Sequence, residues 1–226
     1  MLRPILLSLA LLPAFACAQE DADWIEYRTA YRQMIWFEKY GKPKQFLQNH
    51  FRLRPRDKGV TMEGLRLTLN GKTAHVALPL DALGRAVFPF SKAAYDENAE
   101  LTLNRAAGQV KSGAWVSIVT RPDGVYATAD LRTACEQLLA YLRYSGEARD
   151  KRCVGVQLSY AREAAVQVRY QGPGGAVNAV RGVEGPAFSG DVATGFHIFA
   201  YRFAAEPDGG QVVTSATPLA IAALLE

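Results

Sequence analysis

The chain has 226 residues, of which 49% are hydrophobic and 21% are charged. This is enough apolar material to bury a sizeable core, and it excludes a disordered tail. The formal net charge is +4, and removing Arg3 together with the rest of the first 18 residues leaves +3. So small a positive charge does not by itself predict a nucleic-acid partner. The export signal expected at residues 1–18 makes such a partner less expected.

Residues 1–18 are typical of a secretory signal. One cation precedes an apolar run at 5–12, and the small residues Ala16 and Ala18 fit the rule for signal cleavage. The run is too short to span a bilayer. We therefore expect cleavage after Ala18 and a periplasmic or secreted mature chain without a transmembrane span. The alternative is a lipoprotein signal in which Cys17 is acylated and anchors the chain.

Two cysteines, Cys135 and Cys153, remain after signal removal. Export favours a disulfide between them, because exported proteins meet an oxidising compartment. Closing a loop of this size stabilises a fold by about 3 kcal/mol in the chain-entropy model. The alternative is two buried thiols.

The mature chain opens with a predicted helix from Asp23 to Tyr40. Apolar and aromatic residues recur there at three- and four-residue spacings, and Gly41 and Pro43 end the pattern. Such a stripe normally packs on a core, and a binding platform is the alternative.

Lys39 to Lys58 is the most basic part of the chain, with seven lysines and arginines against one acid, Asp57. Glycines and prolines interrupt it, which predicts a turn, a short helix around 45–51 and an extended arm. Exposed cations of this density suit an anionic partner, and a solvated loop is the alternative. The candidate contact residues are Lys39, Lys42, Lys44, Arg52, Arg54, Arg56 and Lys58.

The clearest β pattern runs from Leu65 to Leu80. The alternating apolar positions are Leu65, Leu67, Leu69, Val76, Leu78 and Leu80. Asn-Gly at 70–71 predicts a hairpin with a two-residue turn. That turn would pair Leu69 with Lys72, and it would place His75 opposite Arg66 on the polar face.

The remaining chain is predicted to be rich in strands, with a helix from Leu131 to Ser145 that Gly146 ends. The predicted strands are 86–88, 99–103, 116–120, 125–129, 154–160, 166–170, 176–180, 196–203 and 211–216. The turn Pro-Asp-Gly at 122–124 predicts a hairpin. The strand at 196–203 is apolar on both faces and is expected to be central and covered twice.

These elements predict an α+β, mainly β fold, with an antiparallel β-sandwich-like body, an N-terminal helix and one internal helix. The expected organisation is a signal peptide at 1–18, a helical and basic lead-in at 19–60, and a β-rich body at 61–226 with its helix at 131–145. Two subdomains that meet near residue 150 are the alternative division.

No catalytic, phosphate-binding or dinucleotide-binding motif occurs. The three histidines fit ordinary positions: His50 in the basic stretch, His75 on a polar face and His197 among core aromatics. No local spacing supplies a pair of metal ligands. We expect no catalytic residues, no metal and no cofactor, and we expect no catalytic role for His75.

Several motifs resemble a family of exported proteobacterial proteins of unknown function. They are LRLTLNGK, LPLDALGR and FPFSKAAYDENAELTLNR, followed later by DGVY and DLRTACEQLLAYLR. The order D-x-x-G-x-x-x-x-P before a strand also resembles transthyretin-like and carboxypeptidase regulatory-like β-sandwich modules. The first resemblance implies no activity, and the second implies a scaffold or binding role.

The function that we expect from the sequence is that of an exported, non-enzymatic binding or scaffold protein of the bacterial envelope. Its partner would be an envelope protein or an anionic envelope surface, bound through the basic segment, an aromatic patch or an exposed sheet edge. One alternative is an envelope hydrolase whose site is assembled from non-local residues. Another is a periplasmic assembly factor for a protein partner.

Overall fold

The computed structural model describes residues 24–105, 107–203 and 209–226. The signal sequence predicted at 1–18, with the lipid-anchor alternative at Cys17, lies outside these ranges. Within them, no helix is both long and apolar enough to cross a membrane.

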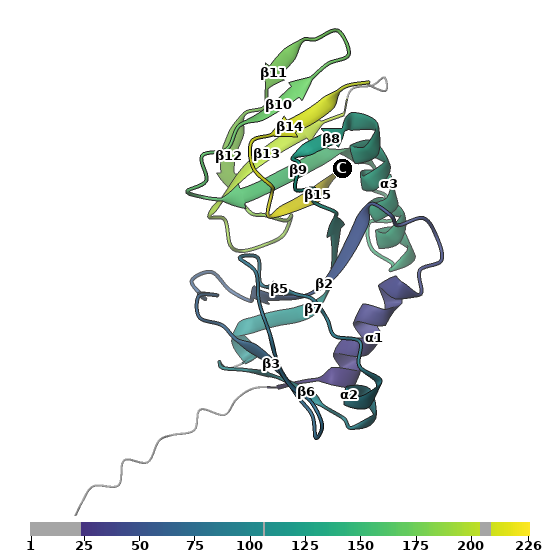
Figure 1. Ribbon diagram of the computed structural model, residues 1–226, viewed down its shortest axis with the longest axis vertical. Coiled ribbons are helices and arrows are strands. Elements are labelled where there is room, and N and C mark those ends of the chain that lie inside the picture. The colour runs from purple at the N-terminus through teal and green to yellow at the C-terminus, as the bar shows by residue number, and fades with distance from the viewer. Residues whose placement is uncertain (1–23, 106, 204–208) are drawn as a thin grey trace, which may run out of the picture.

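The fold is α+β and mainly β, with its strands in three antiparallel sheets (Figure 1). The first sheet has the order β1-β6-β3-β4, from β1 (Trp24–Glu26), β6 (Glu100–Leu103), β3 (Leu67–Asn70) and β4 (His75–Leu78). The second has the order β11-β10-β14-β8, from β11 (Val177–Ala179), β10 (Val168–Gln171), β14 (Gln211–Thr214) and β8 (Val125–Ala127). The third, seven-stranded sheet has the order β12-β13-β9-β15-β7-β2-β5, from β12 (Gly182–Gly185), β13 (Phe196–Arg202), β9 (Cys153–Ala161), β15 (Ala220–Leu225), β7 (Val110–Ile118), β2 (Leu47–Pro55) and β5 (Arg85–Ala86). The helices are α1 (Tyr27–Glu38), α2 (Lys92–Asp96) and α3 (Thr128–Tyr144), with a short 3-10 turn, η1 (Ala107–Gln109).

The N-terminal lobe consists of the first sheet, α1 and α2, packed against β2 and β5 (Figure 1). In its core, Tyr27 and Met34 of α1 meet Phe51 of β2 and Leu101 of β6. The predicted aromatic stripe of this helix is therefore a packing face. Full burial of such apolar side chains stabilises the fold by about 1.5–3 kcal/mol each.

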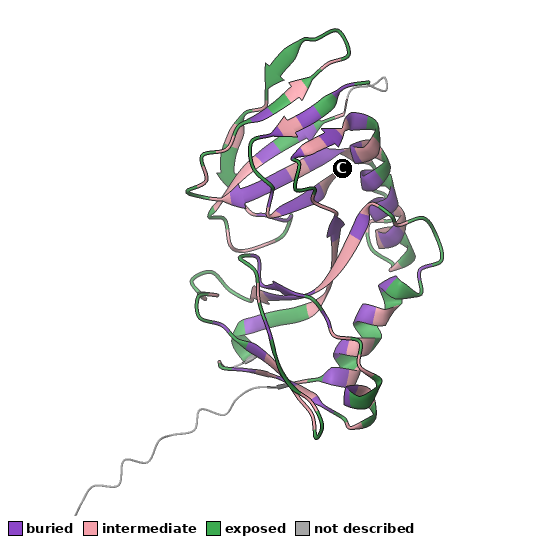
Figure 2. Ribbon diagram, viewed as in Figure 1, coloured by how far each residue is buried: buried purple, intermediate pink, exposed green. Residues whose placement is uncertain are grey.

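The C-terminal lobe packs α3 and the second sheet around β9, β13 and β15. Leu138 of α3 and Leu158 of β9 lie in this core, and Phe37 and Leu47 from the first part of the chain join it. Figure 2 shows buried residues in the sheets of both lobes and on α3. The seven-stranded sheet thus connects the two cores, since β2 and β7 reach from one lobe into the other (Figure 1).

The hairpin predicted around Asn70 and Gly71 exists, but its predicted register is wrong. Leu69 pairs with Val76 and Asn70 with His75, so residues 71–74 form a four-residue loop. Neither Asn70 nor Gly71 has the positive φ that a two-residue turn needs.

The longer loop is held by a contact from outside the hairpin. The Glu97 carboxylate accepts hydrogen bonds from the backbone N–H and the hydroxyl of Thr73. The apolar residues still share one face, because the register is shifted by an even number of residues. His75 no longer lies opposite Arg66, which is outside the strand.

The short helix and extended arm predicted after residue 45 are also wrong. Residues 47–55 form β2, which pairs with β7 along all nine of its residues. Phe51 and Leu53, two residues apart, both point into the N-terminal core, as the two-residue repeat of a strand requires. The many cations between and around them hide this repeat in the sequence. The basic segment is therefore part of the largest sheet, together with strands of the predicted body.

Two further predictions need correction. Val110–Ile118 and Val125–Ala127 form strands, but β8 pairs with β14 in another sheet, so they make no hairpin. The strand at Phe196–Arg202 pairs on both edges, yet only Phe199 and Tyr201 are buried, and Ala200 is exposed. One of its faces is therefore open over part of its length.

Candidate functional site

The structure separates the residues that the sequence grouped as one basic surface. The side chain of Lys44 binds the C-terminal end of α1, where its Nζ donates hydrogen bonds to Phe37 O at 2.6 Å and Glu38 O at 3.0 Å. A cation at the C-terminus of a helix satisfies free carbonyls and complements the helix dipole. The exposed members of the group are Lys39, Lys42, Arg56 and Lys58.

Arg52 is buried and paired inside the fold, unlike the exposed cation that the sequence predicts. Its side chain is 5% exposed, and its guanidinium binds both carboxylate oxygens of Asp191 at 3.1 and 2.5 Å. The same guanidinium lies 4.6 Å from the ring centre of Trp115 and 4.5 Å from that of Phe188. Arg52 therefore fastens the loop that carries Phe188 and Asp191 to the sheet.

A second arginine fastens a second loop. Arg85 Nε donates to Asp81 Oδ2 at 2.7 Å, and its Nη2 donates to Leu219 O at 2.5 Å. Asp81 also accepts the backbone N–H groups of Leu83 and Arg85. In the motif that resembles the β-sandwich modules, the charges of Asp81 and Arg85 thus pair with each other.

The seven-stranded sheet splits between β7 and β15. These two strands pair only at Ile118 and Ile221, and beyond this point they belong to different lobes. On its other edge β7 is paired with β2 throughout, and β15 is paired with β9. We call the space between residues 114–116 of β7 and 222–225 of β15 the interstrand cleft.

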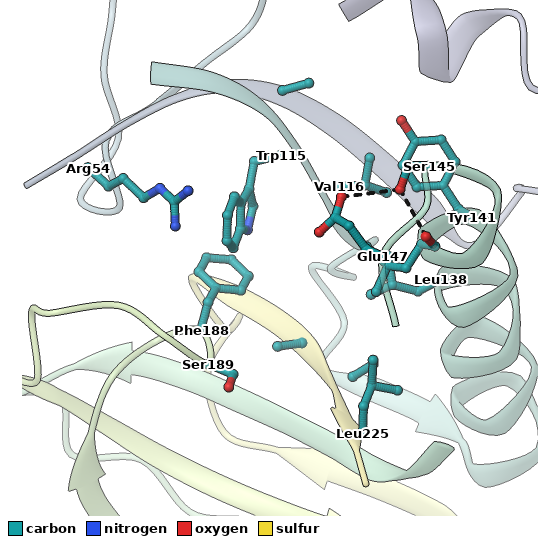
Figure 3. A pocket seen from close by; sticks show the side chains of 14 residues that line it. Arg54, Trp115, Val116, Leu138, Tyr141, Ser145, Glu147, Phe188, Ser189 and Leu225 are labelled. Atoms are coloured by element: carbon teal, nitrogen blue, oxygen red, sulfur yellow. Dashed lines mark hydrogen bonds between the residues drawn. The ribbon is translucent and has the colours of Figure 1, made fainter. Parts of the chain in front are cut away.

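The interstrand cleft is a cavity of about 390 Å³ (Figure 3). Its apolar lining comes from Trp115, Val116, Leu138, Leu142, Phe188, Ala222 and Leu225. Its polar lining comes from Arg54, Tyr141, Ser145, Glu147 and Ser189. Both faces of the sheet contribute, because Leu138 belongs to α3 and Phe188 to the loop on the opposite face.

Arg54 stands at the mouth of the interstrand cleft, with its guanidinium 4.8 Å from the ring centre of Trp115 (Figure 3). Arg54 also lines two further surface depressions beside the cleft. It shares the first with Arg32 and the second with Arg56 and Lys111. We call Arg32, Arg54, Arg56 and Lys111 the basic rim. Over the described part of the chain, no carboxylate forms an ion pair with any of these four.

The lining of the interstrand cleft contains three hydroxyl groups, from Tyr141, Ser145 and Ser189. The hydroxyl of Ser145 has two acceptors in reach, Leu142 O at 3.0 Å and Glu147 Oε1 at 3.2 Å, and no histidine lines the cavity to activate it (Figure 3). Burial raises the pKa of Tyr141 to about 12, so this phenol stays neutral at physiological pH. Residues 24–105, 107–203 and 209–226 contain no cluster of three or more potential metal ligands.

The three histidines lie apart. His50 is half-buried on β2 opposite Trp115, and burial, aided by the nearby Arg85 cation and opposed by Asp81, lowers its pKa. His197 is half-buried on β13 with its ring centre 4.5 Å from that of Phe199, and His75 is exposed on β4. That His75 has no catalytic role stays a prediction.

Cys135 and Cys153 lie at disulfide distance, with their sulfurs 2.26 Å and their Cα atoms 6.0 Å apart. The pair that the sequence predicts therefore joins α3 to the start of β9. It holds α3 on the sheet next to the interstrand cleft, which the end of α3 helps to line.

Sequence reasoning missed most of the residues that build the cleft. Trp115 lay just before the strand predicted at 116–120, and Phe188 and Asp191 lay in an unassigned stretch. Nothing local to these residues signals their roles, since Asp191 meets Arg52 across 139 positions of sequence. The one local cue is Trp115, a large aromatic residue that ends the otherwise small and polar run KSGAW.

No protein-family model, curated protein or solved structure matches this chain. The resemblances drawn from the motifs around residues 65–105 therefore stay predictions.

Proposed function

We propose that the protein is an exported, non-enzymatic binding protein of the bacterial envelope, and that an anionic partner binds it at the interstrand cleft and its basic rim. Export is inferred from the signal pattern in the sequence, and a disulfide-linked cysteine pair suits an oxidising compartment.

The observation that carries the proposal is the position of Arg54. Its cation lies over Trp115 at the opening of an apolar cavity, while the two arginines deeper in the sheet, Arg52 and Arg85, are already paired. A cation at the edge of an apolar cleft favours a ligand with an apolar part and a negative charge. Glu147 is the acidic residue in the lining, and it disfavours a second negative charge at the α3 end.

Capture from envelope extracts tests this proposal. The purified protein is immobilised, exposed to extract and washed across a salt series, and the wild type is compared with the double variant Arg54→Gln/Lys111→Gln. The matched control is Lys72→Gln/Arg169→Gln, which removes two exposed cations that lie away from the cleft. Each cation near an anionic surface contributes on the order of 1 kcal/mol, so the rim variant is expected to lose most of its bound material.

The control variant is expected to capture as much anionic material as the wild type. Equal capture by all three proteins, or no salt-sensitive capture by the wild type, contradicts the proposal. Arg52 is left intact in this design because replacing it would disturb the fold.

A further inference from the structure

We propose that the segment bound in the interstrand cleft is an extended polypeptide of alternating apolar and acidic residues, which adds as a strand between β7 and β15. This inference rests on the proposed function and specifies the partner. It follows from which backbone groups, which side chains and which charges face the cleft.

The backbone of β7 offers the first argument. Just beyond β7, Val119 donates its N–H to Phe46 O at 2.9 Å, in line with the β2–β7 register. Hydrogen bonds in an antiparallel pair come at every second residue. The N–H and C=O groups of Ser112, Ala114 and Val116 therefore point away from β2 and toward the cleft.

The backbone of β15 faces them. Phe203 donates its N–H to Val154 O. The backbone N–H and C=O groups of the even-numbered residues of β9 therefore point toward β13, and those of the odd-numbered residues point toward β15. Ala223 of β15 pairs with Val156, so by the same alternation it points away from β9, into the cleft. The register shifts between Leu224 and Leu225, but Glu226 exchanges backbone hydrogen bonds with Arg152, so its neighbour Leu225 also points away from β9. A strand placed between β7 and β15 thus meets donors and acceptors on both of its edges, which is the basis of peptide recognition by strand addition.

The two lobes hold the cleft open. β7 is fixed through β2 to the N-terminal core, and β15 is fixed through β9 to the C-terminal core. Since each strand is committed on its far edge, the two cannot close on each other without moving a packed core. A site formed in advance binds with a smaller loss of conformational entropy.

The two faces of the cleft differ in chemistry, and this predicts the sequence pattern of the bound strand. Leu138 and Leu142 approach from α3 on one face. Arg54 lies on the other face, because it shares the face of His50, which pairs directly with Trp115. Side chains of a strand alternate between faces, so apolar residues would meet α3 and acidic residues would meet Arg54.

The test uses a fluorescent peptide of about eight residues that alternates valine and glutamate. One control peptide has the same side chains but N-methyl groups at alternate backbone nitrogens, and a second replaces glutamate by lysine. Binding is measured by anisotropy on the full mature protein at low salt. Removing two or more backbone hydrogen bonds is expected to weaken binding about tenfold or more, and the lysine peptide is expected not to bind.

Amide exchange followed residue by residue by NMR locates the peptide. Exchange at Ala114 and Val116 is expected to slow on binding, while Trp115 and Ser117, whose amides face β2, stay unchanged. Failure of the valine–glutamate peptide to bind, equal binding of the N-methylated peptide, or unchanged exchange at Ala114 and Val116 overturns the inference. Slowed exchange with oleate but not with the peptide would assign the cleft to an acyl chain instead.

The two proposals can fail separately. Salt-sensitive capture through the basic rim without peptide binding would leave an anionic partner but reject strand addition. Loss of both results would reject the proposed function together with the inference.

Discussion

Arg52 shows how a residue that looks free in the sequence is used inside the fold. Its guanidinium and the Asp191 carboxylate are both almost fully buried, at 5% and 4% exposure, and two aromatic rings enclose the cation. Sequence composition identified a cluster of cations but could not identify the acid that neutralises this one. The pairing is a tertiary contact between β2 and a loop of the C-terminal lobe.

We predict that Arg52→Ala lowers the free energy of unfolding by about 3–5 kcal/mol, because it leaves Asp191 buried without a counter-charge. Urea denaturation measures the change. Arg52→Met/Asp191→Leu removes both charges, and it is expected to recover much of the loss. A single variant within about 1 kcal/mol of the wild type would contradict a buried ion pair, since losses of that size are typical of exposed pairs.

His50 makes the stability dependent on pH. Burial, and then the Arg85 cation, lower its pKa in the folded protein below its ordinary value of 6.5. The unfolded chain therefore takes up a proton at a higher pH than the folded one. The stabilisation from neutral His50 is present above the unfolded pKa, and it is lost as the pH falls from there through the folded pKa.

We predict that His50→Gln flattens the fall in melting temperature between about pH 7 and pH 5. Thermal melts of both proteins across this range measure the slope. His75→Gln is the matched control, because His75 is exposed, and it is expected to retain the wild-type slope. A His50 variant that loses stability with acid as steeply as the wild type would show that this residue is not the source.

At the scale of elements, the sequence predicted which segments form helices and strands better than it predicted how the strands pair. α1, α3 and most strands between β3 and β14 lie close to their predicted positions, because periodicity and turn residues are local signals. β7 begins six residues before its predicted start at 116, and β12 and β15 were not among the predicted strands. The register at Gly71 and the identity of β2 were missed, since they depend on Glu97 and on β7, which are distant in sequence. The cleft was unpredictable for the same reason, as it exists only where two distant strands part.

The turn before β5 depends on a glycine. Gly84 has φ of +71°, its C=O accepts the N–H of Leu53, and an added Cβ would lie 2.1 Å from Leu53 O. We predict that Gly84→Ala lowers the free energy of unfolding by more than backbone strain alone, because the chain must also move away from β2. Left-handed strain costs about 1–2 kcal/mol, and overpacking adds about 1–3 kcal/mol.

The matched control is Gly59→Ala. Gly59 has φ of +89°, but nothing lies within 4 Å of the position that its Cβ would take. Its variant therefore measures the strain alone, in the same denaturation experiment. Equal losses for the two glycines would show that the contact between Gly84 and Leu53 yields easily.

The Cys135–Cys153 link between α3 and β9 can be tested on its own. We predict that the unreduced folded protein contains no alkylatable thiol from this pair, as mass spectrometry with and without reductant would show. Cys135→Ala/Cys153→Ala is expected to lose about 3 kcal/mol of stability, from the loop that the bond closes. Two thiols that react without reductant in the folded protein would contradict the pairing.

At the scale of the whole molecule, the two lobes share structural elements. Phe37 and Leu47 belong to the first part of the chain but lie in the core of the C-terminal lobe. β2 and β7 begin or end in that core and extend into the other one. Because these strands cannot lose one core without disturbing the other, the lobes are expected to unfold as one cooperative unit.

Two probes can be compared in urea. Trp24 lies in the N-terminal lobe, whereas Trp36 stacks on Tyr144 and Trp115 packs on Phe188, so fluorescence reports on the N-terminal lobe and on its contacts with the C-terminal lobe. Access of reductant to Cys135–Cys153 reports on the C-terminal lobe. Met34→Ala removes a fully buried side chain from the N-terminal core and is expected to cost about 2–5 kcal/mol. We predict that it lowers both midpoints by the same amount. A lower fluorescence midpoint with an unchanged midpoint for disulfide access would instead show two units that unfold independently, and it would revive a division of the chain into subdomains.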